Sequence, residues 1–333
     1  MTSAHSELLL DVENLNVSFA TEEGVVQAVD EVSFRLRAGE VLAVVGESGS
    51  GKSVTAMTLM GLTRSPNARF AGSAKLRELD LISATDDELR AVRAEEIAMI
   101  FQDPMTSLNP VHRIGKQIVE QIQAHRDVSD AEARDLVIAQ LERVGIPRAR
   151  ERFDSYPHEF SGGMRQRVMI AMALSCDPSV LIADEPTTAL DVTIQAQILE
   201  RFRELRAETG AAMILVTHDL GVVADIADRI AVMYAGRIVE TGPVADTLEQ
   251  PIHPYTAGLI GSVPSRNRRG SALAQIPGMM PSLARIPPGC PFHPRCPRAS
   301  AICRAEMPAE AVYGHDRMAR CHHPLGETEP VAA

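Results

Sequence analysis

The chain has 333 residues, 45% of them hydrophobic, which is enough for one large α/β domain and a smaller appendage. Only 4% are aromatic and none is Trp, so surfaces that stack the bases of single-stranded nucleic acid are hard to build. The net charge of −11 argues against duplex DNA, and we expect no nucleic-acid partner. No run approaches the roughly 18 apolar residues of a membrane span, and the residues before Glu7 lack the basic start of a signal peptide. We therefore expect a cytoplasmic chain that serves a membrane only through a partner.

Short apolar runs recur along the chain and predict strands. The first two, 15–19 and 26–36, alternate apolar and polar residues. The third, 41–45, ends in Gly and precedes helix-forming residues, as a buried parallel strand does. Further predicted strands are 97–101, 180–183, 212–216 and 230–234. Helical patterns, notably 163–175 and 193–208, alternate with these runs, and this order predicts an α/β fold with a mainly parallel sheet covered on both faces.

One stretch breaks the alternation. Residues 111–175 contain consecutive amphipathic helical patterns, such as 114–125 and 130–144, with no strand pattern between them. We interpret this stretch as a helical subdomain inserted into the α/β core.

The composition changes near residue 261. Eleven of the 21 Pro lie beyond that point, and the hydrophobic periodicity fades. The same segment has nine Arg against five Asp or Glu, so it carries +4 while the preceding residues carry −15. We predict a separate, loop-rich module, 261–333, which needs a covalent or metal staple to hold its shape.

A glycine-rich loop follows the strand at 41–45. Residues 46–53 fit the pattern G-x-x-x-x-G-K-[ST] between a strand and a helix. Glycines let successive N–H groups face phosphate oxygens, while Lys52 would reach the β- and γ-phosphates and Ser53 would bind Mg²⁺. The alternative is a turn that binds nothing, which the strand–loop–helix context disfavours. The predicted nucleotide contacts are Gly46, Glu47, Ser48, Gly49, Ser50, Gly51, Lys52, Ser53 and Val54.

Two acidic residues directly follow the apolar run at 180–183. Asp184 would complete the Mg²⁺ shell, and Glu185 would orient or deprotonate the attacking water. Alone this pattern is weak, because a solvated strand end has the same appearance. Together with the loop at 46–53 it indicates hydrolysis of a nucleotide.

A further anion-binding pattern lies at the start of the predicted helix 163–175. Ser161, Gly162, Gly163 and Met164 would present a hydroxyl and free N–H groups at a helix N-terminus. An ordinary helix cap would explain Ser161 but not the paired glycines. Because the chain already has one phosphate loop, this second one suggests a site completed across a dimer.

The order of these motifs resembles the ATP-binding-cassette (ABC) family over residues 8–260. Residues 161–167 are similar to the family signature LSGGQ, with Phe160 and Met164 in place of its first Leu and final Gln. The resemblance implies a P-loop NTPase core, an antiparallel β subdomain and a helical subdomain at about 103–178. It also implies that two cassettes close over ATP and Mg²⁺.

The resemblance also implies roles for single residues. Gln102 resembles the glutamine that senses Mg²⁺, water and the membrane partner, and His218 the switch histidine at the γ-phosphate. Asp191, in residues 189–191, resembles the D-loop aspartate. Phe19 resembles the aromatic residue that stacks on adenine, although a core position in its strand explains it equally well. The implied catalytic residues are Glu185, His218 and Gln102, and the implied Mg²⁺ ligands are Ser53, Gln102 and Asp184.

The tail extends the resemblance to nearly the whole chain. Residues 253–256 and 289–297 resemble the C-terminal extension of dipeptide and oligopeptide importer ATPases, and 156–160 with Met164 resemble their D-type subunit. The implied function is ATP-driven peptide uptake at the cytoplasmic face of the cell membrane. The implied partners are a second cassette, which is a sister of the F type or a copy of this chain, two permeases and an external binding protein. The alternatives are import of another solute, such as a metal chelate, and a soluble ABC ATPase. A P-loop kinase or GTPase would leave residues 161–167 and His218 unexplained.

Four of the five cysteines lie in the tail. Cys290, Cys296, Cys303 and Cys321 have the spacing C-x5-C-x6-C-x17-C, and cytosolic thiols in such a set indicate metal binding before disulfides. Zinc sites usually use closer pairs, so the spacing favours a [4Fe–4S] cluster over Zn²⁺, with free thiols as the third possibility. Cys176 we interpret as a small core residue.

Overall fold

The computed structural model describes residues 7–22, 24–103, 107–187, 192–263, 275–314 and 316–326. The chain divides into two units. The first consists mainly of Ala84–Leu215, and the second of Leu10–Leu36, Glu40–Ser83 and the described residues from Val216 onward. Each unit is described by itself.

Parallel strands form the sheet of the first unit. Strand β6 (Ile97–Ile100) pairs with β7 (Val180–Asp184), and β8 (Ala212–Thr217), in which the unit ends, follows in the order β8-β7-β6. Every residue of the three strands is buried. Strands covered on both faces need apolar side chains at each position, which is why they were visible as continuous apolar runs.

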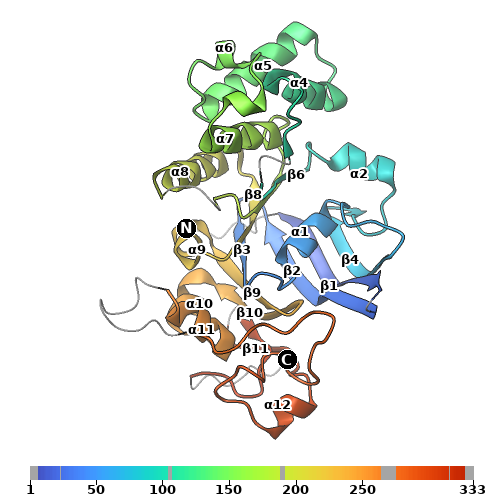
Figure 1. Ribbon diagram of the computed structural model, residues 1–333, viewed down its shortest axis with the longest axis vertical. Coiled ribbons are helices and arrows are strands. Elements are labelled where there is room, and N and C mark those ends of the chain that lie inside the picture. The colour runs from blue at the N-terminus through green and yellow to red at the C-terminus, as the bar shows by residue number, and fades with distance from the viewer. Residues whose placement is uncertain are drawn as a thin grey trace. The chain divides into compact units, whose positions relative to one another are not determined.

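Helices fill the rest of the first unit (Figure 1). Helix α4 (Ile114–His125) buries Ile114, Ile118 and Ile122 on one face, and α5 (Asp130–Arg143) begins in a capping box between Ser129 and Glu132. The others are α2 (Asp86–Val92), α6 (Ala149–Arg152), the short 3-10 helix η1 (Pro157–Glu159), α7 (Gly162–Ala173) and α8 (Val192–Thr209). Between β6 and β7 the described residues contain no strand, as the sequence predicts. Throughout the described ranges, no helix is both long and apolar enough to cross a lipid bilayer.

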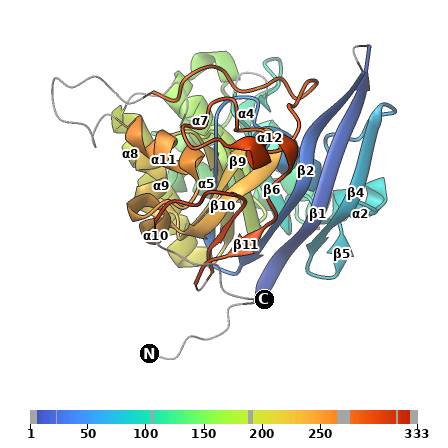
Figure 2. The same ribbon diagram turned by 90° about the horizontal axis from the view of Figure 1, so that it is seen from below.

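An antiparallel sheet forms one part of the second unit. It contains β1 (Leu8–Thr21), β2 (Gly24–Arg37), β4 (Ala68–Leu76) and β5 (Leu79–Asp80) in the order β2-β1-β4-β5. Strand β4 runs antiparallel to both of its neighbours. Figure 2 shows β1, β2 and β4 as neighbouring ribbons. The antiparallel β subdomain that the resemblance implies is therefore confirmed.

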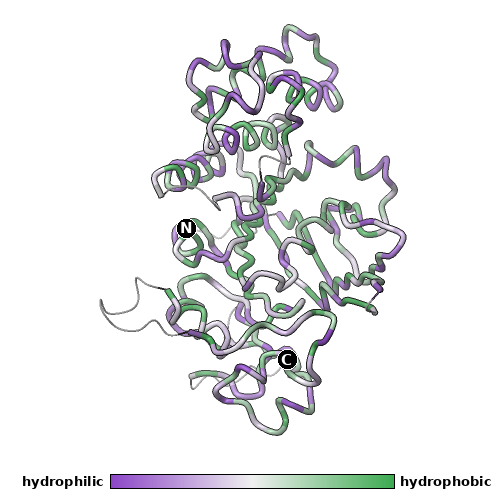
Figure 3. The backbone as a smooth tube through the Cα atoms, in the orientation of Figure 1, coloured by the Kyte–Doolittle hydropathy of each residue, from purple (hydrophilic) through white to green (hydrophobic). Residues whose placement is uncertain are grey.

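The other sheet of this unit joins the phosphate-loop strand to the tail. Strand β3 (Val41–Val45) runs parallel to β9 (Arg229–Tyr234), which continues through β10 (Arg237–Pro243) and β12 (Met318–Ala319) to β11 (Ala311–Val312). The green hydrophobic trace in Figure 3 follows the inner strands, and β3 is buried along its whole length. Because β12 pairs with β10, the tail extends this sheet. The helices of the unit are α1 (Lys52–Leu59), α9 (Leu220–Ile226), α10 (Val244–Glu249), α11 (Pro254–Gly261) and α12 (Ala301–Ala305).

A network of buried hydrogen bonds fixes the start of α11. The Glu240 carboxylate accepts hydrogen bonds from the N–H groups of Ile252 and His253, each at 2.8 Å, and lies 3.3 Å from Arg317. Burial lowers the pKa of His253 to about 3, so its imidazole is neutral and Nδ1 accepts the Tyr255 N–H at 3.0 Å. This cap holds Tyr255 in the core, where its ring packs against Tyr234 and Phe292.

Candidate functional site

The loop after β3 is built from close backbone approaches. Gly46 and Gly51 have φ values of 159° and 104°. A Cβ at Gly46 would lie 2.2 Å from the Met233 carbonyl oxygen, and one at Gly51 would lie 2.4 Å from that of Ala28. Both positions therefore require glycine, and the loop stays tight where β3 turns into α1.

Lys52 lies across this loop. Its side chain is buried, and Nζ donates to the carbonyl oxygens of Gly46 and Glu47 at 2.7 and 2.9 Å. Ser50 is 1% exposed, and its Oγ has no hydrogen-bond partner within the described part of the chain. A buried hydroxyl without a partner costs free energy, so its presence here fits a loop shaped for an anion. The arrangement supports the predicted phosphate cradle.

Two cavities flank the loop in the second unit. One, of about 380 Å³, is lined by Val45, Gly46 and Glu47 together with His218 and its neighbours. The other, of about 990 Å³, is lined by Glu47, Ser48 and Gly49 together with Thr21, Val26 and part of the tail. The structure thus brings His218 to the same cavity as the loop, and Glu47 borders both cavities.

Two residues that the sequence did not single out hold Glu47. The hydroxyl oxygen of Tyr255 accepts the Glu47 N–H at 3.0 Å, and Arg295 Nη1 donates to the Glu47 carboxylate at 2.8 Å. Burial by itself lowers the pKa of Arg295, but its hydrogen bonds and the negative charge of Glu47 outweigh burial and raise it. Arg295 lies 248 positions from Glu47, so no local pattern could reveal the pair.

The predicted hydrolytic residues of the first unit lie together. Asp184, at the end of β7, is 5% exposed, and Glu185 follows with a φ of 47°. Gln102 Nε2 donates to Glu185 Oε2 at 3.1 Å. The left-handed turn redirects the chain at Glu185, and the hydrogen bond fixes its carboxylate relative to β6.

The second anion-binding pattern forms the N-terminus of α7, also in the first unit. Ser161 caps the helix by accepting the Met164 N–H at 3.3 Å. Gly162 is exposed, with open space where a Cβ would stand, while a Cβ at Gly163 would come 3.1 Å from Ile194. The helix N-terminus is therefore accessible at Gly162 and closely packed against Ile194 at Gly163. Asp191 lies outside the described residues.

The remaining predicted nucleotide contacts lie in the second unit. Ser53 and Val54 are half-buried in the first turn of α1. Phe19 is half-buried in β1, where it pairs with Ala68, and is not among the residues that line either cavity.

The tail thiols influence one another electrostatically. Burial raises the pKa of Cys290 and of Cys321 to about 11 each, and neighbouring tail thiols add to both shifts. Burial also raises the pKa of Cys296, with a contribution from Cys303. Among the described residues, no group of three or more His, Cys, Asp or Glu is arranged to hold a metal ion. Neither a [4Fe–4S] cluster nor tetrahedral Zn²⁺ therefore gains support from the described residues.

Comparison with known families gives two matches. Residues 29–188 match the model "ABC transporter", and residues 239–303 match "Oligopeptide/dipeptide transporter, C-terminal region". The second match covers α11, Arg295 and the first three tail cysteines.

Comparison with individual proteins agrees with these family matches. The chain is 52% identical to the oligopeptide transport ATP-binding protein OppD of Salmonella typhimurium, over 97% of this chain and 96% of the relative. It is 51% identical to the dipeptide transport ATP-binding protein DppD of Bacillus subtilis, over 95% and 94%. Among solved structures, the ATP-binding cassette MJ0796 bound to ADP and phosphate covers 71% of the chain with a TM-score of 0.64 and 26% identity; 98% of that protein is covered. For cbiO1 of Clostridium perfringens the coverage is 73% and 91%, the TM-score 0.61 and the identity 28%.

Proposed function

Because the chain belongs to the ABC transporter family, in the branch of oligopeptide and dipeptide transport ATP-binding proteins, we propose that it hydrolyses ATP to drive peptide import. The observation that carries this proposal is the loop at 46–53. There the buried Lys52 side chain bonds to the loop backbone, and the buried Ser50 hydroxyl has no hydrogen-bond partner among the residues that the structure describes. The branch-specific match of the tail supports peptide as the cargo.

The proposed mechanism gives each functional group one role. The loop and Lys52 of one subunit hold the phosphates, and Ser161, Gly162 and Gly163 of a second cassette close over them. Glu185, positioned by Gln102, orients the attacking water, and His218 contacts the γ-phosphate. Loss of the γ-phosphate removes the bridge between subunits, and the pair opens.

Ser53, Asp184 and Gln102 would hold Mg²⁺, whose charge offsets that of the phosphates. The residue types fit this role, because Asp184 is a buried carboxylate at the end of an apolar strand and Mg²⁺ prefers oxygen ligands. Asp191 would complete the interface between two cassettes.

The proposed assembly places this chain at the cytoplasmic face of the membrane with a sister cassette, two permeases and an external binding protein. Purification of the intact complex followed by mass spectrometry tests it. We expect two multi-span proteins and a second cassette, with ATP hydrolysis that rises when peptide-loaded binding protein is added. Recovery of the chain alone, or hydrolysis stimulated only by metal chelates, would contradict peptide import.

We also propose that Cys290, Cys296, Cys303 and Cys321 hold a [4Fe–4S] cluster with a structural role. The proposal rests on the number and spacing of the tail cysteines, since four thiolates are the usual ligands of such a cluster. At their raised pKa values, Cys290 and Cys321 are protonated at neutral pH, so cluster binding must displace protons.

Anaerobic purification tests the cluster. We expect iron and acid-labile sulfide in equal amounts, about four of each per chain, together with broad visible absorption. Cys303→Ser should lose both, whereas Cys176→Ser, a matched change at a buried cysteine outside the tail, should keep them. Stoichiometric zinc without sulfide would disprove the assignment.

A further inference from the structure

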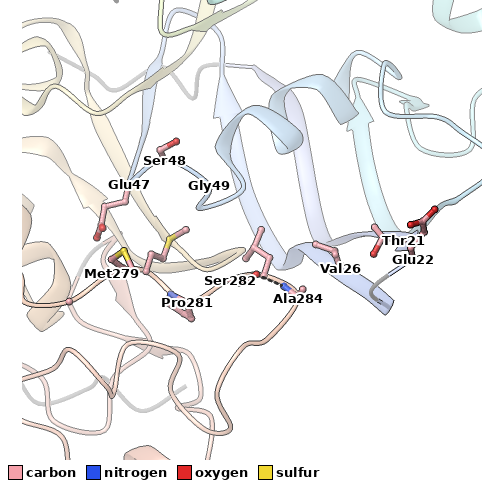
Figure 4. Close-up of a pocket in the computed structure, with 13 residues that line it drawn as sticks. Thr21, Glu22, Val26, Glu47, Ser48, Gly49, Met279, Pro281, Ser282 and Ala284 are labelled. Atoms are coloured by element: carbon pink, nitrogen blue, oxygen red, sulfur yellow. Dashed lines mark hydrogen bonds between the residues drawn. The ribbon is translucent and has the colours of Figure 1, made fainter.

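The larger cavity beside the phosphate loop has a wall made by the tail (Figure 4). Three segments line it: Thr21, Glu22 and Val26 at the turn between β1 and β2, residues 47–49 of the loop, and residues 278–284 of the tail. We call residues 278–284 the tail strap. The cavity measures about 990 Å³, which is large enough for a nucleoside and part of its phosphates.

Each of the two cavities suits a different end of a nucleotide. His218, with the γ-phosphate role proposed above, lies in the smaller one. The larger one lies on the other side of Glu47 and is bordered by Thr21, two residues after Phe19 on the same strand. Residues two apart on a strand point to the same face, so Phe19, for which the family resemblance implies stacking on adenine, and the cavity belong to one side of β1. The adenosine half of the ligand therefore belongs in the larger cavity.

The strap contacts the loop directly. A Cβ at Gly49 would stand 3.2 Å from the terminal methyl carbon of Met280, so that side chain covers the loop backbone. Met279 is 90% exposed beside the cavity, and Val26 faces the cavity from the opposite side. Apolar walls with a few polar groups are typical of nucleoside and other small-molecule sites.

One guanidinium ties the strap to the loop. Arg295 Nε donates to the carbonyl oxygen of Pro277, which directly precedes the strap, at 2.9 Å. Its Nη1 donates to the Glu47 carboxylate at 2.8 Å, and its side chain is 6% exposed. A buried, charge-assisted fork of this kind fixes both groups in one geometry.

We propose that the tail strap is the adenosine-side wall of the nucleotide site, and that Arg295 is the positioning residue that holds this wall against the phosphate loop. The proposal rests on the nucleotide binding proposed above. It assigns to the tail a direct share in nucleotide affinity, besides its place in the sheet.

Binding of two probes to the full-length chain tests this assignment: MgATP, and Mg²⁺ with inorganic tripolyphosphate, which lacks adenosine. Met280→Ala should raise the Kd for ATP about fivefold, as expected for loss of an apolar contact, and leave that for tripolyphosphate within about twofold. Arg295→Ala should raise both by about tenfold, because it frees the loop as well as the strap. Arg295→Lys should recover part of the loss, and Arg298→Ala, an exposed arginine of the same module, should change neither Kd.

A double-mutant cycle separates positioning from general damage. In the Glu47→Gln background, Arg295→Ala should cost less than it does in the wild-type chain, since the shared contact is already weakened. Equal effects of Met280→Ala on both probes, no effect on either, or full additivity of the Arg295 and Glu47 changes would overturn the inference. A wild-type chain that binds neither probe would instead overturn the proposed function.

Discussion

Lys52→Ala is expected to abolish ATP hydrolysis, with a fall in turnover of at least about 10²–10³, the range for loss of one electrostatic donor at the reacting group. Lys52 supplies the only full positive charge within residues 46–53. It is buried, so no solvent ion replaces it when it is removed. ATP affinity should fall in parallel, because the same ammonium group contacts the phosphates before and during the reaction. Steady-state hydrolysis and equilibrium binding of MgATP measure the two effects.

The change also removes two hydrogen bonds inside the loop, from Nζ to the carbonyls of Gly46 and Glu47. A net contribution of about 1 kcal/mol for each bond predicts a measurable but tolerable loss of stability. Lys116→Ala is the matched control, since that lysine is 65% exposed on α4 and pairs only loosely with Glu120 at 3.8 Å. If Lys52→Ala hydrolyses ATP as fast as the Lys116 variant, nucleotide does not bind at this loop.

The elements that the sequence predicted best are those whose own residues determine them. Strand β3 and helix α4 occur at the predicted residues, because a fully buried strand shows as a continuous apolar run and an amphipathic helix shows as a 3.6-residue period. Strands β11 and β12 were not predicted. They have two residues each, too few for any period, and they exist because β10 offers an edge to pair with.

The same distinction holds at the site. The loop at 46–53, Asp184 and Glu185 could be proposed from the sequence because neighbouring residues carry the whole pattern. The contact between Arg295 and Glu47 could not be predicted, because the two residues lie 248 positions apart. The burial of Glu240 could not be predicted, for the same reason. Its burial is made possible by two backbone N–H groups and an arginine, and a carboxylate in a strand is ordinarily expected at the surface.

Glu185→Gln should separate binding from hydrolysis. The amide has the shape of the carboxylate, and its oxygen can still accept the hydrogen bond from Gln102 that spans 3.1 Å in the wild-type chain. What the variant loses is the ability to take a proton from water. Turnover should therefore fall by about 10²–10⁴, the usual contribution of a general base, while ATP affinity stays within about twofold.

The state that accumulates distinguishes this variant from Lys52→Ala. If Glu185 acts after two cassettes have closed over ATP, the Gln variant should remain closed, and size-exclusion chromatography in MgATP should show a stable pair. Lys52→Ala should show none, because its pair never forms around nucleotide. Glu200→Gln, on the exposed side of α8 where it pairs with Arg203, controls for loss of a carboxylate elsewhere in the same unit. Turnover near the wild-type rate in Glu185→Gln would remove Glu185 from the reaction and leave Gln102 without a catalytic partner.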